Sequence, residues 1–168
     1  VVSSNSIFLW GDSHAQALSY GIRNEINARK LPINFYQVAT SGCPPSLTTN
    51  PKSGKIDNNC KYSNEYALSE ILRLKPSVVI LAQVDYHEDV DWEKIAIKLK
   101  NIGVKNVILI GPVPQYKPSL PTIYVRKYWD KNIEYLDAGL DNKILDTNDY
   151  LSQKYSNSKS INHISLIN

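Results

Sequence analysis

The run from Ser77 to Ala82 constrains the fold more than any other feature of the sequence. Nearly every residue in it is apolar, without the alternation of a strand that has one face in water. Such a run is typical of a central strand in a parallel sheet, because helices cover both of its faces. Further strands are predicted at residues 6–10, 33–39 and 106–110, with a short one at Lys143–Leu145.

Between these strands, apolar residues recur at helical spacing. Helices are predicted at residues 13–28, 67–74, 92–102 and 124–136. Because strands and helices alternate, the predicted fold class is α/β: a three-layer α/β/α sandwich with a central parallel sheet, like that of flavodoxin. The sequence contains no repeat and no sign of a second domain, so residues 1–168 are interpreted as one domain.

Composition narrows the range of functions. The 168 residues are 42% hydrophobic and 21% charged, which is ordinary for a globular domain. The net charge of +3 comes from scattered basic residues, so nucleic acid is not an expected partner. No apolar window is long enough to span a membrane.

Polar residues and glycines follow the predicted strands. Asp12 and Ser13 follow the first strand, Gly42 follows the second, and the segment 83–85 follows the third. Ligands of open parallel sheets bind at the carboxyl ends of the strands. A functional site is therefore expected where these residues meet.

Ser13 is the sharpest candidate within this group. It stands where a buried strand turns into a helix, and the first N–H groups of a helix stabilise negative charge. A serine there has two interpretations: a nucleophile, or only the N-cap of the helix. The five residues Gly11 to Ala15 do not decide between them.

A serine nucleophile needs a base, and the chain has three histidines. His163 lies in the segment Asn162–Ser165 near the end of the sequence. His14 directly follows Ser13 and is expected to point elsewhere along the helix. His87 lies in an acidic run that resembles a solvated loop, and no second His or Cys cluster supports a metal site there.

The two cysteines, Cys43 and Cys60, lie in a polar connection rich in Pro, Asn and Lys. The residues alone leave two alternatives open, a disulfide or two free thiols.

Four segments, taken together, resemble the SGNH (GDSL-like) hydrolase superfamily. They are Gly-Asp-Ser-His-Ala at 11–15, Ser-Gly-Cys-Pro-Pro at 41–45, Gly-Pro-Val-Pro at 111–114 and Asn-His-Ile-Ser at 162–165. The order is most similar to the SGNH domain fused to acyltransferase family 3 membrane proteins, which O-acetylate bacterial surface glycans such as lipopolysaccharide O-antigen.

The resemblance implies a role for each motif. Ser13 would be the nucleophile and His163 its base, and the backbone N–H groups of Ser13 and Gly42 would form the oxyanion hole. Cys43 and Cys60 would form a disulfide, which persists outside the cytoplasm. The resemblance implies no cofactor and no metal.

Two positions depart from the family pattern. Val84 occupies the place of the usual oxyanion Asn, so Gln83 is a weak substitute donor. Ser160 occupies the place of the Asp that orients the histidine, three residues before it. Asp12 and Ser160 are therefore the candidate supporting residues.

The leading hypothesis is O-acetyl transfer through Ser13 to a hydroxyl of a bacterial surface polysaccharide. A fused acyltransferase family 3 domain would deliver the acetyl group, and a glycan would accept it. The chain would then be the C-terminal, periplasmic domain of an inner-membrane protein. One alternative is a carbohydrate acetylesterase. The other is a catalytically weak glycan-binding module, and the two departures from the family pattern favour this last interpretation.

Overall fold

The computed structural model describes residues 5–47, 58–134, 136 and 139–167. Its elements, in chain order, are β1 (Ser6–Gly11), α1 (Ser13–Ala28), β2 (Asn34–Ala39), α2 (Asn58–Leu74), β3 (Val78–Ala82), the short 3-10 helix η1 (His87–Asp89), α3 (Trp92–Ile102), β4 (Asn106–Ile110), α4 (Leu120–Lys127), α5 (Asn142–Tyr155) and β5 (Asn162–Ile164). The strands form a parallel sheet in the order β2-β1-β3-β4-β5. The predicted α/β class is confirmed.

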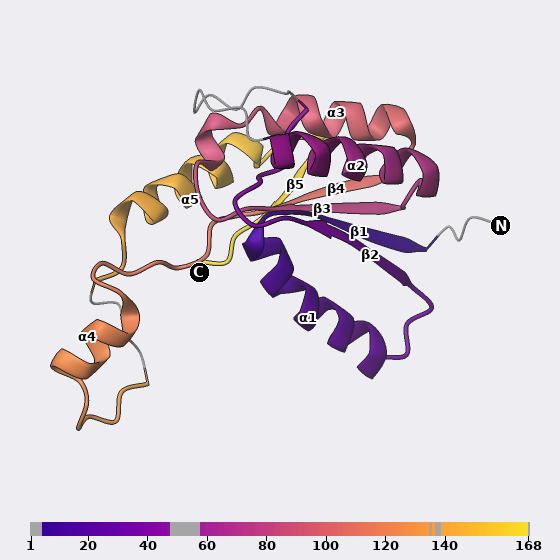
Figure 1. Cartoon of the computed structure of the whole chain (residues 1–168). Coiled ribbons are helices and arrows are strands. Elements are labelled where there is room, and N and C mark those ends of the chain that lie inside the picture. Colours follow the sequence, from indigo (N-terminus) through magenta and orange to yellow (C-terminus); the bar gives the residue numbers. More distant parts are fainter. Residues whose placement is uncertain (1–4, 48–57, 135, 137–138, 168) are drawn as a thin grey trace.

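Helices cover both faces of the sheet (Figure 1). Helix α1 lies on one face, and α2, α3 and α5 lie on the other, while α4 stands apart from the sheet. None of the described helices is long and apolar enough to cross a membrane.

Each face of the sheet has its own apolar core. The larger core joins alternate residues of the central strands to α2, α3 and α5, and includes Trp10, Leu81 and Leu109. The smaller core packs the intervening residues, among them Leu9 and Ile80, against α1. This alternation follows from the strand pleat, which sends neighbouring side chains to opposite faces.

The structure corrects two sequence-based predictions in the last third of the chain. The segment Lys143–Leu145 is not a strand but belongs to α5, whose N-cap Asp141 accepts a hydrogen bond from the Lys143 N–H. The helix predicted at 124–136 begins earlier, because Pro121 suits the first turn, and ends at Lys127. The last strand is β5, in a segment too polar to be recognised.

Gly11 fixes how closely β1, β3 and α1 approach one another. A Cβ at this position would overlap the carbonyl oxygen of Ala82 and lie 2.7 Å from the Cβ of Ala15. Any side chain would therefore push the start of α1 away from the sheet. The glycine holds the following residues, Asp12 and Ser13, directly at the carboxyl end of β1.

Candidate functional site

Ser13 is the first residue of α1 and is exposed to solvent. Its side chain makes no hydrogen bond to any of the residues that the structure describes. The N-cap of α1 is the preceding residue, Asp12. The cap interpretation of Ser13 is therefore excluded, and its hydroxyl is available for chemistry at a helix N-terminus.

Asp12 connects the start of α1 to the end of β3. It is buried, and its Oδ1 accepts a hydrogen bond from the His14 N–H at 2.8 Å. Its Oδ2 accepts one from the Val84 N–H, also at 2.8 Å. Both carboxylate oxygens thus accept hydrogen bonds from backbone N–H groups, one in α1 and one just after β3.

The loop after β2 brings Gly42 to the same end of the sheet. The Thr40 N–H donates to the Gly11 carbonyl at 3.1 Å, and Gly42 adopts the left-handed conformation with φ +71°. The next residue, Cys43, is bonded to Cys60 with an S–S distance of 2.02 Å, so the predicted disulfide is confirmed. The bond ties the Gly42 loop to the first turn of α2.

The two backbone N–H groups expected to form an oxyanion hole belong to Ser13 and Gly42. Within the described part of the chain, neither the Ser13 N–H nor the Gly42 N–H donates a hydrogen bond. Gln83, the weak candidate for a third donor, is buried and its Nε2 donates to the Asp85 carbonyl at 2.6 Å. Gln83 thus stabilises the loop after β3, and its oxyanion role stays a prediction.

His163 lies within β5, where its backbone pairs with Leu109 of β4. Its Nδ1 is 3.5 Å from Ser152 Oγ of α5, and its Nε2 is buried. A Cβ at Gly111 would lie only 2.8 Å from that Nε2, so the glycine leaves room for the ring. Burial lowers the pKa of His163 and thus favours the neutral imidazole.

Ser13 and His163, the expected nucleophile and base, are not hydrogen-bonded to each other in this structure. Through Leu109 and Leu81, His163 is in register with Trp10 of β1, three strands away, which is about 14 Å at the usual strand spacing. The pleat also directs its side chain to the face that α5 covers, whereas α1 lies on the other face. The role of His163 as base stays a prediction.

Ser160 also lies away from the residue it was expected to support. Its Oγ hydrogen-bonds a carboxylate oxygen of Glu93 in α3, and the same carboxylate accepts from Ser158 Oγ at 3.2 Å. Ser160 therefore fastens the segment before β5 to α3. Among the described residues, no carboxylate lies within hydrogen-bond distance of the His163 ring.

The other two histidines are placed differently from each other. His14 lies beside Ser13 in the first turn of α1, and its Nδ1 is buried without a hydrogen-bond partner among the described residues. His87 was expected in a solvated loop, but it is 1% exposed and its ring packs 6.2 Å from that of Trp92. Burial lowers the pKa of His87 to about 4, so it is neutral at physiological pH.

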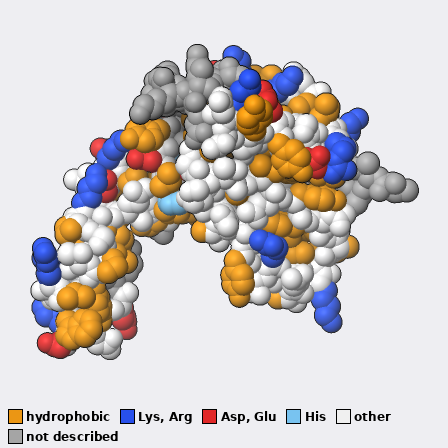
Figure 2. Space-filling model, in the orientation of Figure 1, with side chains coloured by type: hydrophobic (Ala, Val, Ile, Leu, Met, Phe, Trp, Pro, Cys, Tyr) orange, Lys and Arg blue, Asp and Glu red, His pale blue; other side chains and the backbone are white. Residues whose placement is uncertain are grey.

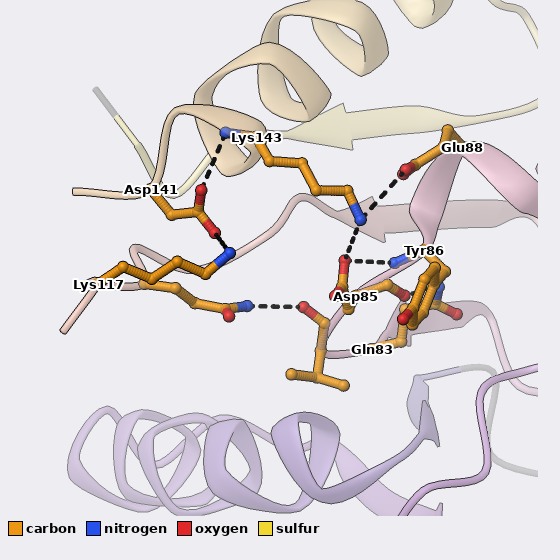
Figure 3. Close-up of polar contacts among 9 residues, drawn as sticks. Gln83, Asp85, Tyr86, Glu88, Lys117, Asp141 and Lys143 are labelled. Atoms are coloured by element: carbon orange, nitrogen blue, oxygen red, sulfur yellow. Dashed lines mark hydrogen bonds and ion pairs between the residues drawn. The ribbon is translucent and has the colours of Figure 1, made fainter. Parts of the chain in front are cut away.

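A charged rim borders the site beyond β3 (Figure 3). Lys143 Nζ lies 3.5 Å from Asp85 and 3.8 Å from Glu88, and these carboxylates raise the pKa of Lys143. The same Nζ is 4.7 Å from the ring centre of Tyr86, which is exposed and has φ +58°. A tyrosine held in the left-handed region is unusual and is typical of functional loops.

Two further contacts at this rim could not be predicted from the sequence pattern. Gln115 Nε2 donates to the Val84 carbonyl at 3.1 Å, and Lys117 Nζ pairs with Asp141 at 2.7 Å (Figure 3). Each contact joins segments that are distant in the chain.

No group of three or more His, Cys, Asp or Glu side chains in the described ranges could hold a metal ion.

The geometry defines a class: an α/β protein that presents a serine at a helix N-terminus, beyond the first strand of a parallel sheet. The chain belongs to the family of SGNH domains fused to AT3 domains, whose model matches residues 2–156. The match ends before His163.

The fold is also similar to a solved structure, the periplasmic domain of the lipopolysaccharide acetyltransferase of Salmonella ser. Paratyphi A. The two share 26% sequence identity with a TM-score of 0.76, over 98% of this chain and 67% of that one. No match was found among the curated proteins.

Proposed function

We propose that residues 1–168 are the periplasmic domain of a membrane-bound O-acetyltransferase that modifies a bacterial surface polysaccharide of the lipopolysaccharide O-antigen type. The observation that carries the proposal is the exposed hydroxyl of Ser13 at the start of α1, at the end of the sheet where the Gly42 loop is hydrogen-bonded to Gly11. The family of SGNH domains fused to AT3 domains and the Salmonella acetyltransferase domain support it.

The reaction has two steps that use the same groups. Ser13 Oγ attacks the carbonyl carbon of an acetyl ester or thioester and loses its proton to the base. The N–H groups of Ser13 and Gly42 stabilise the tetrahedral oxyanion, and the leaving group departs with that proton. A sugar hydroxyl then attacks acetyl-Ser13 and gives its proton to the base. The base passes this proton to Ser13 Oγ as the acetylated sugar leaves, which restores the Ser13 hydroxyl.

The base in this proposal is His163, which must first leave the position it has in β5. The pairing that holds it there is short, because β5 has three residues and joins only β4. Within that pairing, the Gly111 N–H donates to the Ile164 carbonyl at 2.8 Å. The proposal therefore requires this edge strand to move so that the imidazole reaches Ser13, and the active arrangement differs from the one described.

The partners follow from the same proposal. A fused AT3 domain in the inner membrane delivers the acetyl group, and the glycan is the acceptor. The disulfide between Cys43 and Cys60 agrees with a site outside the cytoplasm.

The test uses the whole protein in cells that make the polysaccharide. Ser13→Ala should abolish O-acetylation, measured by NMR on the purified polysaccharide, and mass spectrometry should find an acetyl group on the Ser13 peptide of the wild type only. Ser69→Ala, at another exposed helix serine, is the matched control and should keep wild-type acetylation. Wild-type acetylation by Ser13→Ala would overturn the proposal, and acetyl release to water would identify an acetylesterase.

The placement of His163 favours a second candidate, a glycan-binding module. An aromatic ring such as that of Tyr86 provides a stacking surface, and Asp85 and Glu88 provide acceptors for sugar hydroxyls. Under this candidate, Tyr86→Ala weakens binding of the isolated polysaccharide in calorimetry, and Ser13→Ala does not. Tyr20→Ala, at a more exposed tyrosine on α1, is the control.

A further inference from the structure

The segment between β4 and α5 projects from the molecule as a separate lobe. We define the α4 lobe as residues 112–134, which leave the sheet at the carboxyl end of β4 and carry α4. Figure 1 shows α4 well away from the helices that cover the sheet. The lobe is therefore exposed to solvent on more sides than a helix that packs on the sheet.

The surface of the lobe is unusually apolar. Trp129 is 67% exposed and Val125 is 56% exposed, and Leu120 and Tyr124 are exposed beside them. Leu120 and Tyr124 also line an open hollow of about 380 Å³. Exposed apolar groups that gather in this way mark a contact surface, whereas single ones are common on any protein.

Basic side chains surround these apolar groups. Arg126, Lys127 and Lys131 are exposed, and none of them forms an ion pair with another described residue. Figure 2 shows hydrophobic side chains over the lobe, with Lys or Arg side chains and some acidic side chains beside them. Counting also the paired Lys117, residues 112–134 hold four basic and two acidic residues (Asp130 and Glu134), a local charge of +2.

We propose that the α4 lobe docks on the surface of an anionic lipid bilayer. Trp and Tyr occupy the level of the lipid headgroups, aliphatic side chains insert beneath them, and Lys and Arg bind anionic headgroups. The lobe combines all three kinds of side chain on one projection, and its exposed basic side chains complement the charge of the lipid. A protein partner with a neutral apolar face would leave Arg126 and Lys127 without a counter-charge.

Docking would also orient the functional site. The lobe leaves the sheet from Gly111, at the same end where Asp12 and Ser13 follow β1. A lobe bound to the bilayer therefore turns the carboxyl ends of the strands towards the lipid surface. The inference goes beyond the proposed function and does not depend on the role of Ser13.

The three tryptophans make the test direct. Trp10 and Trp92 are buried, so Trp129 is the exposed fluorophore. The 168-residue chain is mixed with phosphatidylcholine vesicles, with or without phosphatidylglycerol. We expect a blue shift of the emission and co-sedimentation with the anionic vesicles alone, both reversed by salt.

Variants separate the lobe from general surface charge. Arg126→Glu with Lys127→Glu should lower the affinity for anionic vesicles about tenfold or more, and Val125→Ala with Trp129→Ala should lower co-sedimentation. The control pair Lys98→Glu with Lys105→Glu has the same change in net charge outside the lobe and should bind nearly as the wild type does.

Three results would overturn the proposal. They are the absence of wild-type binding to anionic vesicles, equal losses in the lobe pair and the control pair, and binding without a blue shift. A wild-type lobe that fails to bind lipid but binds a purified AT3 domain would identify a protein partner instead. Loss of lipid binding with normal Ser13-dependent acetylation, or the reverse, keeps this proposal distinct from the proposed function.

Discussion

The carboxylate of Asp12 accepts a hydrogen bond from the backbone N–H of Val84, 2.8 Å away, while its other oxygen caps α1. One buried side chain thus sets the position of Ser13 relative to β3. The contact uses the backbone N–H of residue 84, so it does not depend on the valine that stands in the place of the expected oxyanion Asn.

Asp12→Ala should reduce both stability and acetyl transfer. The variant loses an N-cap and leaves the Val84 N–H without its buried acceptor, which together cost about 2–3 kcal/mol of unfolding free energy. Asp91→Ala is the matched control, because Asp91 caps α3 through the Lys94 N–H at 3.1 Å, away from the site. Chemical denaturation and polysaccharide acetylation are measured for both. Equal acetylation in the two variants would show that Asp12 serves stability alone.

The proposed base can be tested without any structural change at Ser13. His163→Ala should lower acetyl transfer about 10²–10⁴-fold, the range for loss of a general base. Ser152→Ala removes the contact of His163 Nδ1 in β5 and should leave acetylation at the wild-type level or above it. His14→Ala examines the histidine beside Ser13. If His163→Ala acetylates normally and His14→Ala does not, the assignment of His163 is wrong.

His87 should make the protein less stable in mild acid. Its pKa is about 4 in the folded state and about 6.5 in the unfolded state, so the unfolded chain binds the extra proton first. Above about pH 6.5 His87 is neutral in both states, so it does not lower the unfolding free energy. As the pH falls from about 6.5 to about 4, the unfolding free energy should drop by about 3 kcal/mol. His87→Gln stays neutral and should flatten this part of the stability curve, measured by urea denaturation at each pH. If the unfolding free energy of His87→Gln falls with pH as steeply as that of the wild type, His87 is not the cause of the acid sensitivity.

The disulfide should support both the fold and the Gly42 loop. Cys43 and Cys60 are 17 residues apart in sequence, and opening a loop of this size costs about 3 kcal/mol. The double variant Cys43→Ser with Cys60→Ser should therefore unfold at lower denaturant concentration and transfer acetyl groups more slowly. Acetylation by the folded double variant at the wild-type rate would show that Gly42 needs no tether.

The sequence alone determined the main frame of the molecule. The apolar runs at β1, β3 and β4 and the helical spacing after Ser13 reflect burial on both faces of a parallel sheet, which few other folds satisfy. The placement of Asp12 and Ser13 follows from that frame, because residues that directly follow a strand lie at its carboxyl end, and in a parallel sheet all carboxyl ends lie at the same edge. The pairing of Cys43 with Cys60 came from the family resemblance, not from local pattern.

Only the tertiary structure decided the surroundings of the site. His163 was expected near Ser13 because its motif resembles that of the family. The structure instead places it in β5, which forms through backbone pairing with β4, and the side-chain pattern of so short a strand does not reveal such pairing. The contacts of Asp12 with Val84 and of Lys143 with Asp85 join segments far apart in the chain. Local sequence carries the propensity to form each element, whereas the distances between elements are set by how their surfaces pack.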